Sequence, residues 1–175
     1  MNFLNRRKLS LKIGENYLEI ADKIKKYYPL EHLFFDKLEE VFDRKREDAQ
    51  EESLNLPKSI WNLGQKFIIT TNYDNVLDWT SPIRAKHLDI QSDYELASSV
   101  REEINEETIL YLHGHIDKKS NLVLTTDTYN RLYNDSDDAE FKTALETLKI
   151  KLATKSFLFL GYSLDDEFFV DELEK

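Results

Sequence analysis

Three short polar clusters in this chain contain the residue types that enzymes use for catalysis. The first, 70–75, holds hydroxyl, amide and carboxylate groups; the second, His-Gly-His at 113–115, offers bases that titrate near neutral pH. The third, 161–166, adds the Ser163 hydroxyl and two carboxylates. Such a set suits the addition of water to a sugar carbon or the hydrolysis of an ester, and the residue types alone do not choose between them.

Each polar cluster comes directly after a short apolar run, so all three are expected to share one structural setting. Continuous runs of this kind are typical of strands that are covered on both faces. The predicted strands are 67–71, 108–112, 122–125 and 156–160. In an open parallel sheet, ligands bind outside the carboxyl ends of the strands. The sequence therefore predicts that the three clusters meet in one crevice.

Helical periodicity predicts helices before and between these strands. The helices are expected over 17–28, 30–42, 127–133 and 141–152. Pro29 ends the first of them, Pro57 suits the first turn of another helix, and Ser136 or Asp137 can cap the last. Strands that alternate with helices predict an open α/β fold with a mostly parallel sheet and a helical N-terminal segment.

Composition bounds the class of protein. The chain has 175 residues, of which 41% are hydrophobic and 12% aromatic, enough apolar mass for one folded domain. The absence of cysteine excludes disulfides, cysteine-ligated zinc, iron–sulfur clusters and a thiolate nucleophile. A net charge of -10 argues against a nucleic-acid partner, and no apolar run approaches the length of a membrane span. We expect a cytoplasmic protein that binds neither nucleic acid nor a membrane.

Purely structural roles are open for every one of these motifs. The Asn-Tyr-Asp-Asn segment 72–75 can be a turn and helix cap, and a histidine beside glycine can bond to loop backbone. Ser163 can cap the last helix, with the acidic run 165–167 favouring its N-terminus. The remaining histidines, His32 and His87, show no partner pattern and are interpreted as surface or packing residues.

The order of the motifs resembles the sirtuin-like family, most closely its bacterial branch in anti-phage defence proteins. The resemblance covers roughly residues 56–170. The matching segments are Ile69-Thr70-Thr71-Asn72-Tyr73-Asp74, Leu112-His113-Gly114, Leu122-Val123-Leu124-Thr125 with Tyr129, and Leu160-Gly161-Tyr162-Ser163-Leu164 with Asp166. This resemblance implies a Rossmann-like three-layer domain that cleaves the bond between nicotinamide and ribose in NAD.

The resemblance also implies residue roles. Asn72 would position the attacking water or a ribose hydroxyl, and Asp74 would hold the nicotinamide carboxamide or the ribose. His113 would be the general base, and His115 is the weaker candidate because the family places the base directly before the glycine. The residues expected to line the bound NAD are Thr70, Thr71, Gly114, Gly161 and Ser163.

The missing cysteines bear on the reaction that the resemblance implies. Protein-deacylating sirtuins carry a four-cysteine zinc module, which this chain lacks. We therefore expect plain NAD hydrolysis, with NAD as substrate and no metal, in place of protein deacylation. The alternative is a non-catalytic module that binds NAD or ADP-ribose as a sensor, scaffold or partner-binding domain.

One departure from the family favours that alternative. The family's first strand leads into a glycine-rich loop, whereas residues 1–66 contain only Gly14 and Gly64. A short alternating segment at 8–14 is the candidate replacement for that strand. We interpret 1–175 as a single truncated or minimal domain, with 1–55 mainly helical and 56–175 forming the core. A homo-oligomer or another chain is then expected to complete it.

Overall fold

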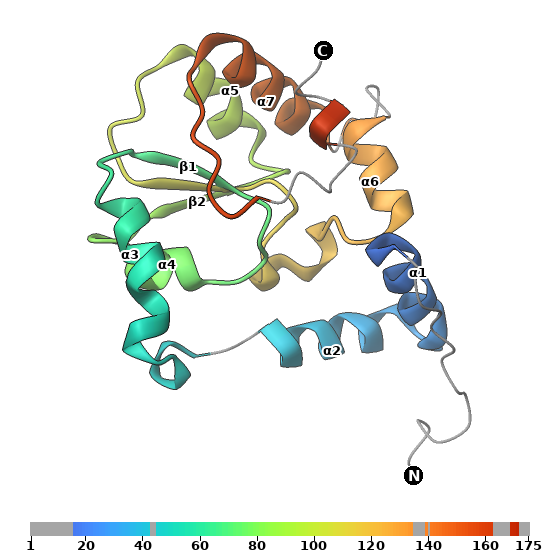
Figure 1. The fold of residues 1–175 in the computed structure, drawn as a ribbon. Helices are drawn as coiled ribbons and strands as arrows, with labels where there is room; N and C mark the ends of the chain where they lie inside the picture. The colour runs from blue at the N-terminus through green and yellow to red at the C-terminus, as the bar shows by residue number, and fades with distance from the viewer. Residues whose placement is uncertain (1–15, 43–44, 135–138, 140, 163–168, 172–175) are drawn as a thin grey trace.

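A parallel sheet of three strands lies at the centre of the molecule (Figure 1). The computed structural model describes residues 16–42, 45–134, 139, 141–162 and 169–171. The strands are β1 (Phe67–Thr70), β2 (Lys86–Asp89) and β3 (Thr108–Tyr111), in the order β1-β3-β2. Thr70 and Asp89 both pair with Tyr111, so the three strands end at one edge of the sheet.

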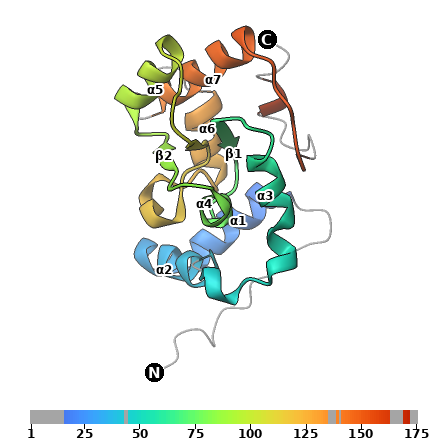
Figure 2. The same ribbon diagram turned by 90° about the vertical axis from the view of Figure 1, so that its left-hand side faces the viewer.

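Helices surround this sheet and form two outer layers, as Figures 1 and 2 show from two sides. The α-helices are α1 (Tyr17–Tyr27), α2 (Glu31–Phe42), α3 (Asn55–Trp61), α4 (Val76–Thr80), α5 (Asp93–Arg101), α6 (Thr126–Tyr133) and α7 (Lys142–Thr154). The short 3₁₀ helices of the described residues are η2 (Arg46–Asp48), η3 (Glu51–Leu54) and η4 (Ile116–Asn121).

Side-chain alternation along β3 divides the core into two clusters. Leu110 belongs to the larger cluster, which packs against α5, α6 and α7. Ile109 and Tyr111 belong to the smaller cluster, which packs against α3 and α4. Because successive strand residues point to opposite faces, this division makes a three-layer arrangement of helices, sheet and helices. The predicted fold class, an α/β domain of Rossmann-like type, is confirmed.

The N-terminal helices α1 and α2 lie against η4 and α6 rather than against the sheet (Figure 1). Asn16 caps α1 by accepting a hydrogen bond from the Glu19 amide at 2.8 Å. Lys119 of η4 pairs with Asp36 and Glu39 of α2 across the boundary. The helical N-terminal segment predicted from periodicity is therefore present and docks on the core.

Two predicted strands are wrong, because neither 122–125 nor 156–160 forms a strand. In the first, the backbone amides of Leu124 and Thr125 bond to the Thr128 hydroxyl, so they cap α6 and build no ladder. In the second, Leu158 is 70% exposed, so the apolar run is not a buried strand. The sequence analysis also missed β2 and α5, whereas the helices predicted at 17–28, 30–42, 127–133 and 141–152 are confirmed.

The start of α7 differs from the prediction. This helix begins at Lys142, and Phe141 occupies its N-cap position without a side-chain capping bond. The expected caps Ser136 and Asp137 lie outside the described residues. Within the described ranges, no helix combines the length and the apolar character needed to cross a membrane.

Candidate functional site

A tight turn at the end of β3 separates the two histidines of the His-Gly-His motif. The Gly114 amide donates to the Tyr111 carbonyl at 3.0 Å, and Gly114 has a φ of +85°. A Cβ atom at this position would lie 2.3 Å from the Asn121 carbonyl oxygen. Only glycine meets both conditions. The turn ends the strand alternation, so His113 and His115 contact different layers of the molecule.

His113 is buried between two tyrosines of α6. Its Nε2 lies 2.7 Å from the Tyr133 hydroxyl, and its Nδ1 lies 3.2 Å from the Tyr129 hydroxyl. Burial lowers the pKa of His113 to about 3, so the imidazole is neutral at pH 7. In a neutral ring one nitrogen donates and the other accepts. The two tyrosines therefore hold His113 in a fixed orientation, and their hydroxyls can serve either tautomer because each can donate or accept.

His115 has an entirely different environment. Its Nε2 lies 2.8 Å from Asn75 Oδ1, and its ring packs on Tyr111 with 4.2 Å between ring centroids. The His87 ring lies 5.2 Å away, and Asp78 Oδ1 is 2.9 Å from His87 Nε2. Burial lowers the pKa of His115, as does the His87 charge, while nearby aspartates oppose this shift. Since Asn75 Oδ1 can only accept, His115 carries its proton on Nε2.

The loop after β1 uses several of its polar groups to shape itself. Asp74 Oδ1 accepts a hydrogen bond from the Val76 amide at 2.9 Å, which forms the turn into α4. Asn75 occupies the N-cap position but makes no capping bond, because its amide oxygen faces His115. The structural interpretation of this motif is therefore correct for Asp74. Asn72 has an exposed side chain beyond the end of β1.

Hydrogen bonds join the loop after β1 to the loop after β3. The Leu112 amide donates to the Thr70 carbonyl at 2.9 Å, which extends the strand pairing past its end. The Ile116 amide donates to the Tyr73 carbonyl at 3.0 Å, and the Tyr73 hydroxyl donates to the Val123 carbonyl at 2.7 Å. The first two predicted clusters thus lie together at one edge of the sheet, linked through Tyr73 and Asn75.

The third predicted cluster is described only at its start. Gly161 has a φ of +66°, and no atom lies within 4 Å of a Cβ built on it. Tyr162 packs its ring against Phe169 with 5.2 Å between ring centroids. Ser163, Asp165 and Asp166 lie outside the described residues.

Sequence reasoning missed two contributors to this region: His87, which flanks His115, and Tyr133, which contacts His113. Asn75, which contacts His115, belongs to the first polar cluster that the sequence indicated. The spacing of Tyr129 and Tyr133, four residues apart on one helix, was the available signal for a pair on one face. His87 carried no such signal, because its strand, Lys-His-Leu-Asp, contains no apolar run. Among the described residues, no group of three histidine, aspartate or glutamate side chains can hold a metal ion.

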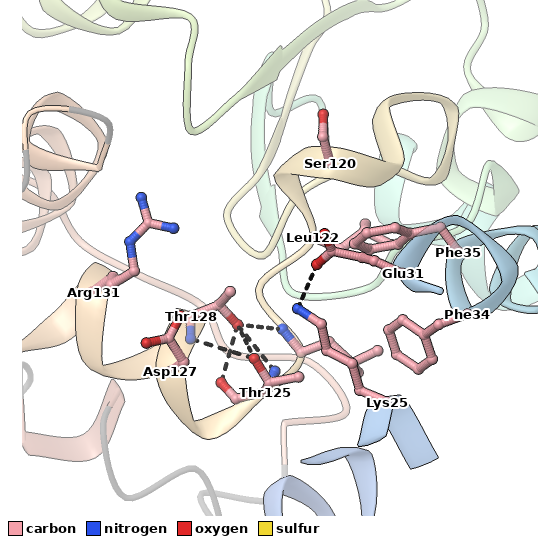
Figure 3. Close-up of a pocket in the computed structure, with 11 residues that line it drawn as sticks. Lys25, Glu31, Phe34, Phe35, Ser120, Leu122, Thr125, Asp127, Thr128 and Arg131 are labelled. Atoms are coloured by element: carbon pink, nitrogen blue, oxygen red, sulfur yellow. Dashed lines mark hydrogen bonds and ion pairs between the residues drawn. The ribbon is translucent and has the colours of Figure 1, made fainter. Parts of the chain in front are cut away.

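A separate cavity of about 260 Å³ lies between α1, α2, η4 and α6 (Figure 3). Lys25 and Arg131 bring positive charge to it, and Glu31 and Asp127 bring negative charge. Lys25 pairs with Glu31 at 2.8 Å, and the Arg131 guanidinium stacks over the Phe141 ring at 4.6 Å. Because these opposite charges balance, the lining favours no ligand charge.

Comparisons with known proteins agree with the motifs. The chain is 40% identical over 98 residues to NAD(+) hydrolase ThsA of Enterococcus faecium, which is 55% of this chain and 19% of that protein. It is 32% identical over 100 residues to NAD(+) hydrolase ThsA of Cytobacillus dafuensis, covering 55% of this chain and 18% of that protein. The matches thus span about a fifth of the length of these curated relatives. No solved structure matches the chain.

A family model gives the broadest match. The model described as SIR2-like domain matches residues 66–175, which contain β1, β3 and all three polar clusters. This match covers more than half of the chain and agrees with the resemblance that the motif order indicated. The chain therefore belongs to the SIR2-like domain family.

Proposed function

We propose that this domain hydrolyses NAD at the bond between nicotinamide and ribose, and that it acts in anti-phage defence by depleting NAD. The names of the two relatives support the reaction. The observation that supports the proposal is a neutral, oriented His113 that follows β3, the strand paired with β1, after which Asn72 and Asp74 come. A base must be unprotonated at working pH, and His113 meets that requirement.

The reaction asks little of the protein beyond orientation and proton removal. Nicotinamide leaves as a neutral molecule, because the electron pair of the breaking bond neutralises its ring nitrogen. The ribosyl carbon gains oxocarbenium character, a water oxygen bonds to it, and His113 takes the proton of that water. Asn72, exposed at the strand end, orients the water or a ribose hydroxyl. Asp74 holds the carboxamide or the ribose with its second carboxylate oxygen, because the first accepts the hydrogen bond of the Val76 amide in the turn.

His113 must become accessible for this step. Of its two partners, Tyr129 is half-buried and makes the longer contact, 3.2 Å at Nδ1, whereas Tyr133 is buried and lies 2.7 Å from Nε2. We therefore assign Nδ1 as the atom that accepts the proton once substrate displaces the Tyr129 hydroxyl. Contacts of this kind often tighten or rearrange only in the substrate complex.

Other residues are proposed to line the substrate. Thr70 and Thr71 stand half-buried at the end of β1, where their hydroxyls can bond to ribose. Gly161 has a positive φ angle and open space where a Cβ would lie, so substrate can approach its backbone closely. Gly114 is proposed by its place in the motif, because the Asn121 carbonyl already fills the corresponding space there. Ser163 completes the set by its place in the motif. We further propose that a homo-oligomer or another chain completes this site.

The burial of His113 between the two tyrosines favours a second function. A base with a pKa of about 3 is weak at neutral pH, and both of its nitrogens are occupied. These features suit a non-catalytic module that binds NAD or ADP-ribose as a sensor or scaffold.

Nicotinamide release separates the two functions. The intact chain is incubated with NAD beside His113→Ala, Asn72→Ala and a control, His32→Ala, whose exposed imidazole lies on α2. If the domain hydrolyses NAD, the intact chain and His32→Ala should release nicotinamide, and His113→Ala and Asn72→Ala should lose most of that release. Absence of turnover in the intact chain would overturn the enzymatic proposal, and calorimetric binding of ADP-ribose would then support the sensor.

A further inference from the structure

The helix that holds His113 is itself held by a residue far away in the sequence. Tyr129 and Tyr133 both come from α6, and the start of α6 is bonded to Asp22 of α1. We propose that Asp22 is a positioning residue for His113, because its carboxylate fixes the first turn of α6 and thereby the tyrosine pair. This inference rests on the proposed function for its kinetic consequence, but its structural part can be measured alone.

Asp22 accepts a hydrogen bond from a backbone amide at the start of α6 that the local capping box does not bind. Thr125 and Thr128 form a reciprocal capping box, in which the Thr125 hydroxyl accepts from the Thr128 amide. The Thr126 amide lies outside this box, and it donates to Asp22 Oδ1 at 3.2 Å. The Thr126 hydroxyl donates to Asp22 Oδ2 at 2.6 Å. Both carboxylate oxygens thus bind one residue at the helix start, where negative charge is favoured by the helix dipole.

The short length of α6 makes this cap important. The helix has eight residues, and isolated helices of that length are not stable in water. Tyr129 is the fourth residue of the helix, and its amide closes the first turn by donating to the Thr125 carbonyl at 2.9 Å. Fraying of the first turn would therefore move Tyr129 away from Nδ1 of His113. Tyr133, one turn further on and buried, would move less.

The N-terminal helices also contact the other half of the site. Phe42 at the end of α2 packs edge-on against Tyr73, with 5.6 Å between ring centroids. Tyr73 belongs to the loop that bears Asn72 and Asp74. The pair α1 and α2 precedes residues 66–175, which the family model matches, yet it touches both the loop after β1 and the helix that clamps His113. The two N-terminal helices thus contact both parts of the candidate site from outside the matched residues.

The test compares three single variants. Asp22→Ala removes both acceptors, and Asp22→Asn keeps one oxygen acceptor without the charge. Asp36→Ala is the matched control, because Asp36 also joins the N-terminal helices to the core but does so through an exposed ion pair with Lys119. Nitrogen-15 NMR of the histidine rings reports the tautomer and hydrogen bonding of His113 in folded molecules only. Nicotinamide release gives kcat and KM, corrected for the folded fraction.

We expect Asp22→Ala to shift the His113 ring resonances, because the Tyr129 contact at Nδ1 is weakened, and to lower kcat on the order of tenfold, about 1.4 kcal/mol, with KM little changed. Asp22→Asn should restore most of both signals, and Asp36→Ala should match the unaltered chain. Unchanged His113 resonances in Asp22→Ala would overturn the inference. If the unaltered chain releases no nicotinamide, the proposed function fails, and the resonances alone decide the positioning role.

Discussion

His113 and His115 lie two residues apart, yet they occupy opposite environments. His113 lies on the side of the larger core cluster between two phenol groups, with burial as the cause of its lowered pKa. His115 lies on the side of α4, against Asn75, Tyr111 and His87, where aspartates oppose the effect of burial. The difference shows that a His-Gly-His motif holds one imidazole that is clamped by the tyrosines of α6 and one that contacts the loop after β1, and that the turn at Gly114 separates them.

Single substitutions of the two histidines should sharpen this comparison most. His113→Ala is expected to lower nicotinamide release at least about 100-fold, the usual contribution of a general base. His115→Ala should lower it about tenfold, because Asn75 loses its partner and the loop that bears Asn72 shifts while the base stays. Initial rates at saturating NAD measure both effects. Equal losses in the two variants would mean that the motif does not divide its roles.

The turn that separates the two histidines is open to a direct stability test. Gly114→Ala should cost about 3 kcal/mol of unfolding free energy, because it combines a positive φ with the clash against the Asn121 carbonyl. Gly161→Ala should cost only about 1 kcal/mol, since its φ of +66° is strained but the space around it is open. Urea titrations measure both values. Gly64→Ala, with similar φ and open space, serves as the control, and equal costs for all three would contradict the steric argument.

The pH dependence of stability is the third test. The unfolded His113 imidazole binds a proton below pH 6.5, whereas the folded ring binds one only near pH 3. The unfolded state therefore holds more protons in this window, and stability falls as the pH falls from 6.5 toward 3, by up to about 1.4 kcal/mol per pH unit. His113→Gln should flatten this slope in urea titrations between pH 4 and 6.5. An unchanged slope in His113→Gln would show that the ring is not kept neutral by burial.

The sequence was sufficient for features that depend on neighbours along the chain. Helical periodicity predicted α1, α2, α6 and α7, because the stripe that each helix buries recurs every three or four residues. The order of four motifs indicated the SIR2-like family, which the comparisons confirm. The motifs also placed Asn72, Asp74 and His113 directly after strands, and the structure has Asn72 and Asp74 after β1 and His113 after β3. Their roles in the reaction stay predictions.

Strand prediction failed where hydrophobicity and backbone pairing disagree. β2 reads Lys-His-Leu-Asp, with its first two residues exposed, so it lacks the apolar run that marks a buried strand. The segment 156–160 has that run but forms no strand. Apolar residues indicate that a segment tends to be buried. A strand also needs a neighbouring strand whose backbone groups can pair with it, and the local sequence does not reveal that neighbour.

By itself, the sequence determined the family, the helices and the polar motifs at the ends of two strands, since each depends on residue type and short spacing. Only the tertiary structure decided which layer each histidine contacts, which tyrosines hold His113, and that Asp22 caps a helix 104 residues away. The physical reason is that the sequence around one hydrogen-bonding residue does not indicate which distant residue folding will bring next to it. Burial and partner geometry, which set the pKa of His113, exist only once the layers have packed.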